Sequence, residues 1–247
     1  MKNKKRINII DEIRGLLMIL IVVFHLFYSL DVIFEVKAFR GVYASMLSWQ
    51  PILPAMFILI SGISFQLSRS NVKRGLKLLA VACLMTAVLA VFMPGSIIWF
   101  GIIHFLAVMN IVFGLLQKYV NKIPAIAGIA VCAFLFILTY NVQLGFIGIK
   151  GIWSYTLPEV MYSTDLTAPL GFYTENFHSS DYTPILPWMF MFIIGTILGR
   201  YTKYIPEILV KLHIKPLAFI GRHCLIIYLL HQPVIVGILY LIFNMNS

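Results

Sequence analysis

Seven long apolar runs constrain the fold of this chain more than any other feature of its sequence. Most of them are about 18 to 23 residues long, the length of helix that crosses a hydrocarbon layer of roughly 30 Å. They are apolar on every side and lack a ten-residue alternation, so they do not resemble the strands of a membrane β-barrel. We expect helices over residues 13–30, 50–68, 76–93, 98–117, 123–140, 185–199 and 223–243.

Composition supports the same fold class. Of the 247 residues, 61% are hydrophobic and 11% are charged, and the mean hydropathy is +0.94, more than a soluble core of this size needs. No linker or repeat divides the chain, so residues 1–247 are expected to form one all-α, multi-pass membrane domain. The one long connection, residues 141–184, has the length of a lid or binding element, with Trp153 and Tyr155 expected at headgroup level.

Lysine and arginine are distributed unevenly among the connections. With the N-terminus on the cytosolic side, 16 of the 19 basic residues lie inside, which favours an odd number of spans. The net charge of +10 therefore reflects membrane topology beside anionic lipid, and we expect no nucleic-acid partner. The inner residues are Lys2, Lys4, Lys5, Arg6, Arg14, Arg69, Lys73, Arg74, Lys77, Lys118, Lys122, Arg200, Lys203, Lys211, Lys215 and Arg222, and the outer ones are Lys37, Arg40 and Lys150.

The first predicted helix carries the segment RGLLMILIVVFH, in which Arg14 and His25 enclose ten mostly apolar residues. Eleven residue steps cover about 16 Å and complete three turns with about 20° left over, so the two residues share a face. Arg14 then lies at the cytosolic boundary and His25 near mid-membrane, and Asp11 can hold the guanidinium in a salt bridge. One interpretation is an interfacial anchor with a packed histidine. The other is a polar track, because titratable groups in membranes usually face a cavity or partner.

Two further histidines lie in predicted spans. His104 lies in FGIIHFLAVMN, and His231 comes two residues before Pro233. Arg222 and His231 would lie on nearly opposite faces of a regular helix. A structural and a catalytic role remain open for both histidines. Because the three histidines come from different helices without paired spacing, and the three cysteines are irregularly spaced, we expect no metal site.

Polar residues at the two membrane surfaces supply further candidates. The segment RSNVKRGLK holds Arg69, Lys73 and Arg74, which either reflect topology or, with Arg14 and Arg222, form an electrostatic seat for a phosphate-bearing donor. On the outer side, an acceptor would meet residues at the mouth of the predicted bundle. The candidates there are Asp31, His178, Asp181 and Trp188.

A family resemblance extends over nearly the whole chain. It is carried, in order, by IIDEIRGLLMIL, SGISF, FGIIHFLAVMNIVFGLL, DYTPILPW and FIGRHCLIIYLLHQPV. These segments resemble the short bacterial proteins of the heparan-alpha-glucosaminide N-acetyltransferase-like family. Arg14, ten residues and His25 also match the R-X10-H pattern in the first helix of the related acyltransferase family 3.

The resemblance implies transfer of an acyl group, usually acetyl from cytosolic acetyl-CoA, to a sugar or glycolipid on the far side of the bacterial cytoplasmic (inner) membrane. It implies that His25 acts as the base or acyl carrier and that Arg14 orients the donor. Expected partners are membrane lipids and an extracytoplasmic glycan or glycolipid. Residues 31–49 hold no histidine, whereas the human lysosomal enzyme uses one after its first helix, so its substrate is not carried over.

Two other functions fit the same polar track. A proton-coupled transporter or a lipid or glycan flippase would use histidines in the membrane and a kinked last helix, although the chain shows no inverted repeat. A noncatalytic membrane subunit is the third possibility. Since the chain has fewer predicted spans than the related acyltransferases, a homodimer is a further expectation.

Overall fold

The computed structural model describes residues 7–205 and 213–244, so Lys2, Lys4, Lys5, Arg6 and Lys211 of the charge count lie outside the described residues. By internal contacts the chain forms two compact units. The first unit combines residues 1–60 with residues 204–247, and the second holds residues 61–203. The expectation of one membrane domain stays a prediction.

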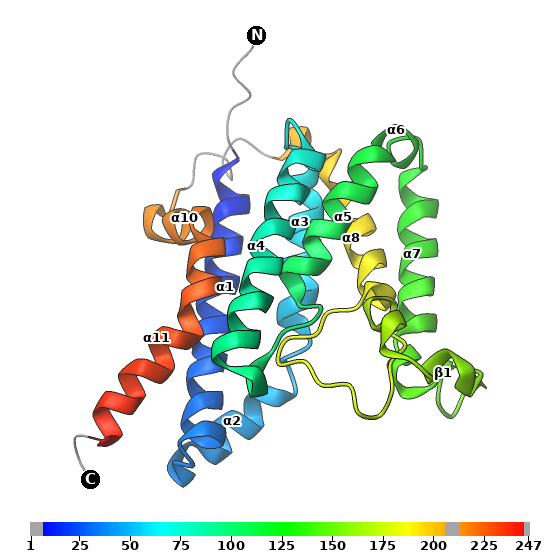
Figure 1. Ribbon diagram of the computed structural model, residues 1–247. Coiled ribbons are helices and arrows are strands. Elements are labelled where there is room, and N and C mark those ends of the chain that lie inside the picture. The colour runs from blue at the N-terminus through cyan, green and yellow to red at the C-terminus, as the bar shows by residue number, and fades with distance from the viewer. Residues whose placement is uncertain (1–6, 206–212, 245–247) are drawn as a thin grey trace. The chain divides into compact units, whose positions relative to one another are not determined.

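The first unit is built from helices taken from both ends of the chain (Figure 1). The long α1 continues into a π-helical turn, and a bent pair of helices follows. After the second unit, the chain returns as the short α10 and the long α11. The bounds are α1 Asn8–Tyr28, the π-helix Ser29–Ile33, the 3-10 helix Lys37–Phe39, α2 Arg40–Leu47, α3 Ile52–Phe65 (which ends in the second unit), α10 Lys215–Arg222 and α11 Cys224–Asn244.

The second unit holds the middle helices and the long connection. Its helices are α4 Asn71–Phe92, α5 Ile102–Leu115, α6 Gln117–Val120, α7 Ala125–Thr139 and α8 Ile185–Gly199, and its strands are β1 Phe146–Ile149 and β2 Trp153–Thr156. Short 3-10 turns cover Pro94–Ser96, Val142–Leu144, Glu159–Tyr162, Asp165–Leu170 and, at the boundary of the units, Thr202–Tyr204.

All seven predicted apolar runs form helices, but they differ in length. In the described part of the chain, four are long and apolar enough to cross a membrane: Asn8–Ile33, Asn71–Phe92, Ala125–Leu144 and Cys224–Phe243. The pair Lys37–Leu47 and Ile52–Phe65, bent by 51°, makes up to five. The helices α5 and α8, with 14 and 15 residues, reach only about 21 to 23 Å at 1.5 Å per residue. The protein is thus a helical membrane protein, and the count of seven spans stays a prediction.

Within the first unit, α1 makes two different contacts. A Cβ on Gly15 would lie 2.0 Å from the Leu217 carbonyl oxygen, and a Cβ on Gly221 would lie 1.7 Å from the Asp11 carbonyl oxygen. The backbones of α1 and α10 therefore touch at two glycines, as small residues permit in membrane helix pairs. By contrast α11 runs alongside α1 in the same direction (Figure 1). When a chain crosses the membrane an odd number of times, its first and last helices run in the same direction.

Small residues also join helices in the second unit. A Cβ on Gly62, in the SGISF segment, would lie 2.3 Å from the Phe192 carbonyl oxygen of α8. A Cβ on Gly75 of α4 would likewise lie 2.8 Å from the Ala107 carbonyl oxygen of α5. The small residues of SGISF therefore let α3 and α8 pack closely.

Two local features were not predicted from the sequence. Residues 146–156 form an antiparallel hairpin, in which Phe146 pairs with Thr156 and Ile149 with Trp153. Its connecting turn contains Gly151 at φ 92°, a conformation that glycine adopts without steric cost. The second feature is a break at His223 between α10 and α11. Because of this break, Arg222 and His231 do not share one regular helix, and the argument from opposite faces fails.

Candidate active site

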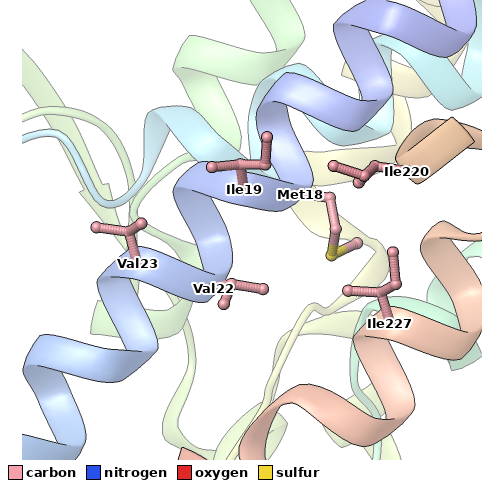
Figure 2. A pocket seen from close by; sticks show the side chains of 6 residues that line it. All are labelled: Met18, Ile19, Val22, Val23, Ile220 and Ile227. Carbon is pink, nitrogen blue, oxygen red and sulfur yellow. The ribbon is translucent and has the colours of Figure 1, made fainter. Parts of the chain in front are cut away.

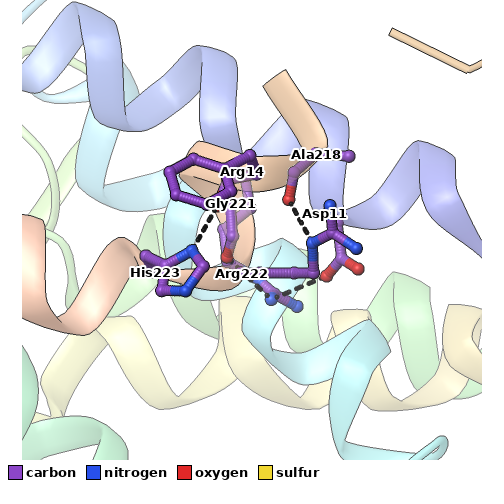
Figure 3. A network of polar contacts seen from close by, with 7 residues as sticks. Asp11, Arg14, Ala218, Gly221, Arg222 and His223 are labelled. Carbon is purple, nitrogen blue, oxygen red and sulfur yellow. Dashed lines mark hydrogen bonds and ion pairs between the residues drawn. The ribbon is translucent and has the colours of Figure 1, made fainter. Parts of the chain in front are cut away.

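The α1 end that carries Arg14 is held by a compensated charge pair (Figure 3). Arg14 Nη1 lies 3.2 Å from Asp11 Oδ1 and donates to the Gly221 carbonyl oxygen at 3.4 Å. The side chains of Arg14 and Asp11 are only 14% and 8% exposed. The predicted salt bridge is confirmed, and the structure adds that Arg14 ties α1 to the last turn of α10. Arg222 is exposed, and its Nε donates to the Ala218 carbonyl oxygen at 3.1 Å.

A second acid on α1 fixes the start of α10. Glu12 Oε1 accepts a hydrogen bond from the Ile214 amide at 3.0 Å and lies 2.9 Å from His213 Nδ1. Glu12 is buried, and its partners come from residues about 200 positions away in the chain. Asp11 and Glu12, which come just before the first apolar run, therefore help to hold α10 across the end of α1.

Beyond the charge pair, a small apolar hollow of about 170 Å³ lies where α1 meets α10 and α11 (Figure 2). Four α1 side chains face one residue of each partner helix across it, and none of the six carries a polar group. The lining residues are Met18, Ile19, Val22, Val23, Ile220 and Ile227. The four on α1 lie between Arg14 and His25 in the sequence.

After the hollow, two imidazoles meet between α1 and α11. The ring centroids of His25 and His231 are 4.8 Å apart, with the ring planes at 62°. His231 Nδ1 lies 2.6 Å from the Tyr228 carbonyl oxygen, which can only accept, so Nδ1 carries a proton. In a neutral ring, His231 Nε2 then has the lone pair. His25 Nδ1 is buried and has no hydrogen-bond partner among the described residues.

The next contact along the same interface is also polar. Gln232 Nε2 donates to Ser29 Oγ at 3.1 Å. Ser29 is fully buried, and Gln232 Oε1 is buried without a partner in the described part of the chain. An apolar cluster of Leu30, Ile235 and Leu239 follows. Sequence reasoning missed Ser29 and Gln232, because neither residue is charged and no local pattern distinguishes them.

His104 belongs to the second unit and has different neighbours. Its ring stacks on Phe100 with centroids 5.9 Å apart, and its Nε2 lies 3.3 Å from Thr86 Oγ1. Since the Thr86 hydroxyl donates to the Ile98 carbonyl oxygen at 2.5 Å, His104 Nε2 must be the donor to Thr86. In a neutral ring, His104 Nδ1 then carries no proton. This nitrogen is buried and has no partner among the described residues. A catalytic role for His104 stays a prediction.

The outer candidates have mainly structural contacts. Asp31 Oδ1 lies 3.4 Å from Arg40 Nε in the first unit. Asp181 Oδ2 accepts from the Ile102 amide at 3.0 Å and so caps the start of α5. Trp188 packs edge-on against Phe136, with centroids 5.7 Å apart, and His178 is exposed. Binding of an acceptor by these four residues stays a prediction.

The basic segment after α3 lies at the first turns of α4. Arg69 and Lys73 are exposed, while Arg74 is half-buried. A helix N-terminus with such cations suits a phosphate group, and donor binding there stays a prediction. Within the described residues, no three side chains of histidine, cysteine, aspartate or glutamate form a group that could hold a metal ion.

Comparison with known families shows to which family the chain belongs. The model of the heparan-alpha-glucosaminide N-acetyltransferase catalytic family matches residues 6–233, which include every residue of the α1, α10 and α11 contacts described above up to Gln232. The chain belongs to this family. Membership in the heparan-alpha-glucosaminide N-acetyltransferase family points to an acetyltransferase, in agreement with the apolar helices of a membrane enzyme. Neither the curated proteins nor the solved structures give a match.

Proposed function

We propose that the protein is a membrane acyltransferase that moves an acyl group, with acetyl as the proposed one, from cytosolic acyl-CoA to a sugar or glycolipid acceptor on the extracytoplasmic side. His25 is the base or acyl carrier, with His231 beside it. The cytoplasmic membrane of a bacterium is the proposed location. Family membership supports acetyl transfer in general, and the first unit supplies the residues for it.

The contact between His25 and His231 is the observation that carries this proposal. Two imidazoles 4.8 Å apart, from helices at opposite ends of the chain, form a titratable pair inside a membrane protein. A buried polar nitrogen without a partner is costly, and such groups in membrane helices mark functional sites. The unpartnered Nδ1 of His25 therefore supports a role in which a substrate supplies the missing partner.

Neutral imidazole is suited to the chemistry of acyl transfer. A hydroxyl or amino group of the acceptor attacks the thioester carbonyl, a new C–O or C–N bond forms, and the C–S bond breaks. A nitrogen of His25 takes the proton that the acceptor loses, and this proton leaves with the thiolate of coenzyme A. In the acyl-carrier version, the same nitrogen attacks the thioester first and the acceptor then attacks the acyl-imidazole.

The residues between Arg14 and His25 suit the donor's thioester arm. Arg14 and Arg222 mark a basic end of the first unit, and the apolar hollow occupies the next turns of α1. The nucleotide of coenzyme A carries phosphates that stay in water, whereas its acyl end is long, thin and only moderately polar. Arg69, Lys73 and Arg74 belong to the second unit, and the part of Arg69 and Lys73 in donor binding is tested separately.

The decisive experiment measures transfer from radiolabelled acetyl-CoA by the purified protein in detergent, with glucosamine and extracted envelope lipids as acceptor probes. We expect labelled product, release of coenzyme A and a thermal shift with acetyl-CoA. Absence of all three would overturn the proposal and favour a transporter or flippase. If His104→Ala abolishes transfer while His25→Ala keeps it, the chemistry belongs to the second unit instead.

A further inference from the structure

The interface between α1 and α11 holds two polar contacts in succession. Ser29 is the first residue of the π-helical turn that continues α1, and it comes four residues after His25, so the two side chains lie on the same face. Their partners, His231 and Gln232, are neighbours on α11, and the two contacts measure 4.8 Å between ring centroids and 3.1 Å between Gln232 Nε2 and Ser29 Oγ. The amide of Gln232 is therefore fixed one helical turn of α1 beyond the imidazole pair.

The amide oxygen of Gln232 is the unusual atom in this arrangement. The contact with Ser29 uses the NH2 group, which orients the opposite end of the amide. Gln232 Oε1 is buried, yet no hydrogen bond reaches it from the described residues. A buried amide oxygen without a donor costs free energy, because water satisfied it before folding. Together with His25 Nδ1, the interface thus holds two buried polar atoms that have no hydrogen-bond partner among the described residues.

These two atoms differ in what they can do. An imidazole nitrogen can take a proton, whereas an amide oxygen only accepts a hydrogen bond. A substrate with one reacting group and a neighbouring hydroxyl or amino group would satisfy both atoms. Sugars and amino sugars carry such adjacent donors on neighbouring carbons.

We propose that Ser29 and Gln232 form the acceptor subsite beside His25, with Gln232 Oε1 accepting a hydrogen bond from the hydroxyl or amino group next to the one that is acylated. This inference rests on the proposed acyltransferase function. Ser29 acts through Gln232 as a positioning residue. The acceptor class is a polyol or amino sugar with vicinal hydrogen-bond donors, and a simple amine lacks the second contact.

The test compares two probes of matched shape in the full-length protein: trans-2-aminocyclohexanol, which has a vicinal donor, and cyclohexylamine, which has none. The variant Gln232→Met keeps the side-chain length and removes the amide. We expect Gln232→Met to raise the KM for aminocyclohexanol about tenfold, the usual effect of one lost hydrogen bond. The KM for cyclohexylamine and the KM for acetyl-CoA should stay within twofold. Comparing two probes in two proteins separates the loss of this hydrogen bond from any general effect of the substitution on folding or activity.

Companion variants keep the result interpretable. Ser29→Ala should raise the KM for aminocyclohexanol about threefold, because the Gln232 amide loses its anchor. Gln232→Glu retains an acceptor oxygen and should bind the aminocyclohexanol within threefold of wild type. If Gln232→Met does not fold, Ser29→Ala decides the matter, because its KM should rise for aminocyclohexanol and stay unchanged for cyclohexylamine. Val234→Ala, on an exposed position of α11, should change neither KM.

The outcomes separate this inference from the function on which it rests. If wild-type protein transfers acetyl to neither these probes nor glucosamine nor envelope lipids, the proposed function fails and the subsite with it. If wild type transfers acetyl but Gln232→Met and Gln232→Glu keep the same ratio of KM values for the two probes, only the subsite is overturned. An equal loss with both probes would also overturn it, since that pattern indicates a packing role.

Discussion

The two contacts of α1 differ in how completely they satisfy the groups that they bury. Against α10, two glycines bring the backbones together, and the charge of Arg14 is compensated by Asp11 and a carbonyl oxygen. Toward α11, a hollow of about 170 Å³ begins beside Ile220 of α10, and two buried polar atoms have no partners in the described residues. Packing and hydrogen bonding there are incomplete.

The difference indicates a division of work along one helix. A contact with every group satisfied contributes stability and tolerates little change, whereas buried polar groups without a partner cost free energy that a ligand can restore. We therefore expect substitutions near Gly15 and Gly221 to affect folding. Substitutions near His25 and Gln232 should affect turnover instead.

The strongest test of this division is His25→Ala. Loss of the proton-accepting group should reduce kcat for acetyl transfer by about 10²- to 10⁴-fold, while the unfolding midpoint in detergent stays within a few degrees. His223→Ala removes an exposed histidine at the break before α11 and serves as the control, with wild-type transfer. A His25→Ala protein that unfolds rather than losing activity would make this half of α1 structural too.

The next largest effect is expected from Gly221→Ala. A Cβ would lie 1.7 Å from the Asp11 carbonyl oxygen, and neither atom can rotate away, because the backbone fixes both positions. We expect a loss of about 3 kcal/mol in stability, measured by chemical or thermal unfolding in detergent. Gly237→Ala is the matched control, because a Cβ there meets nothing within 4 Å. Equal stability of the two variants would contradict the tight contact.

A smaller effect on stability is expected from Asp11→Asn. The variant keeps the shape of the side chain but leaves the poorly exposed Arg14 without its anion, at a cost of about 1 to 2 kcal/mol. Arg40→Gln breaks the pair with Asp31, in which Arg40 is 67% exposed, and should change stability little. Matching unfolding curves for both variants would show that the Arg14 pair adds nothing to the α1 and α10 contact.

The smallest effect is expected in the second unit. The double variant Arg69→Gln and Lys73→Gln should raise the KM for acetyl-CoA about two- to fivefold at low salt, and the difference should shrink as ionic strength rises. Lys150→Gln, in the turn of the hairpin, removes a cation predicted to face the other side and is the control. An unchanged KM would leave Arg69 and Lys73 with a role in topology alone.

Local features of the sequence predicted most of the fold. Each apolar run is contiguous, so hydropathy alone located the seven helices, and the bond from Arg14 to Asp11 spans only three residues. Strands of four residues in the hairpin are too short for a clear alternation. The break at His223 depends on α10 turning across α1, which no local pattern shows.

Local features of the sequence predicted only part of the candidate site. The segment containing His25 carried a recognisable spacing, and its role as a site residue stays a prediction. The pairing with His231, and the adjacent pairing of Ser29 with Gln232, joins positions far apart in sequence. Such contacts depend on tertiary packing, so spacing along one helix could single out His25 without finding what it faces.

The parallel pairing of α1 with α11 has a consequence for the order of events during synthesis. Ser29 and Gln232 are 203 positions apart, and ribosomes add about 5 to 20 residues each second. The first helix therefore waits about 10 to 40 s before its partner is made. A nascent chain meanwhile holds His25 without His231, so the proposed chemistry starts only once the last helix is in place.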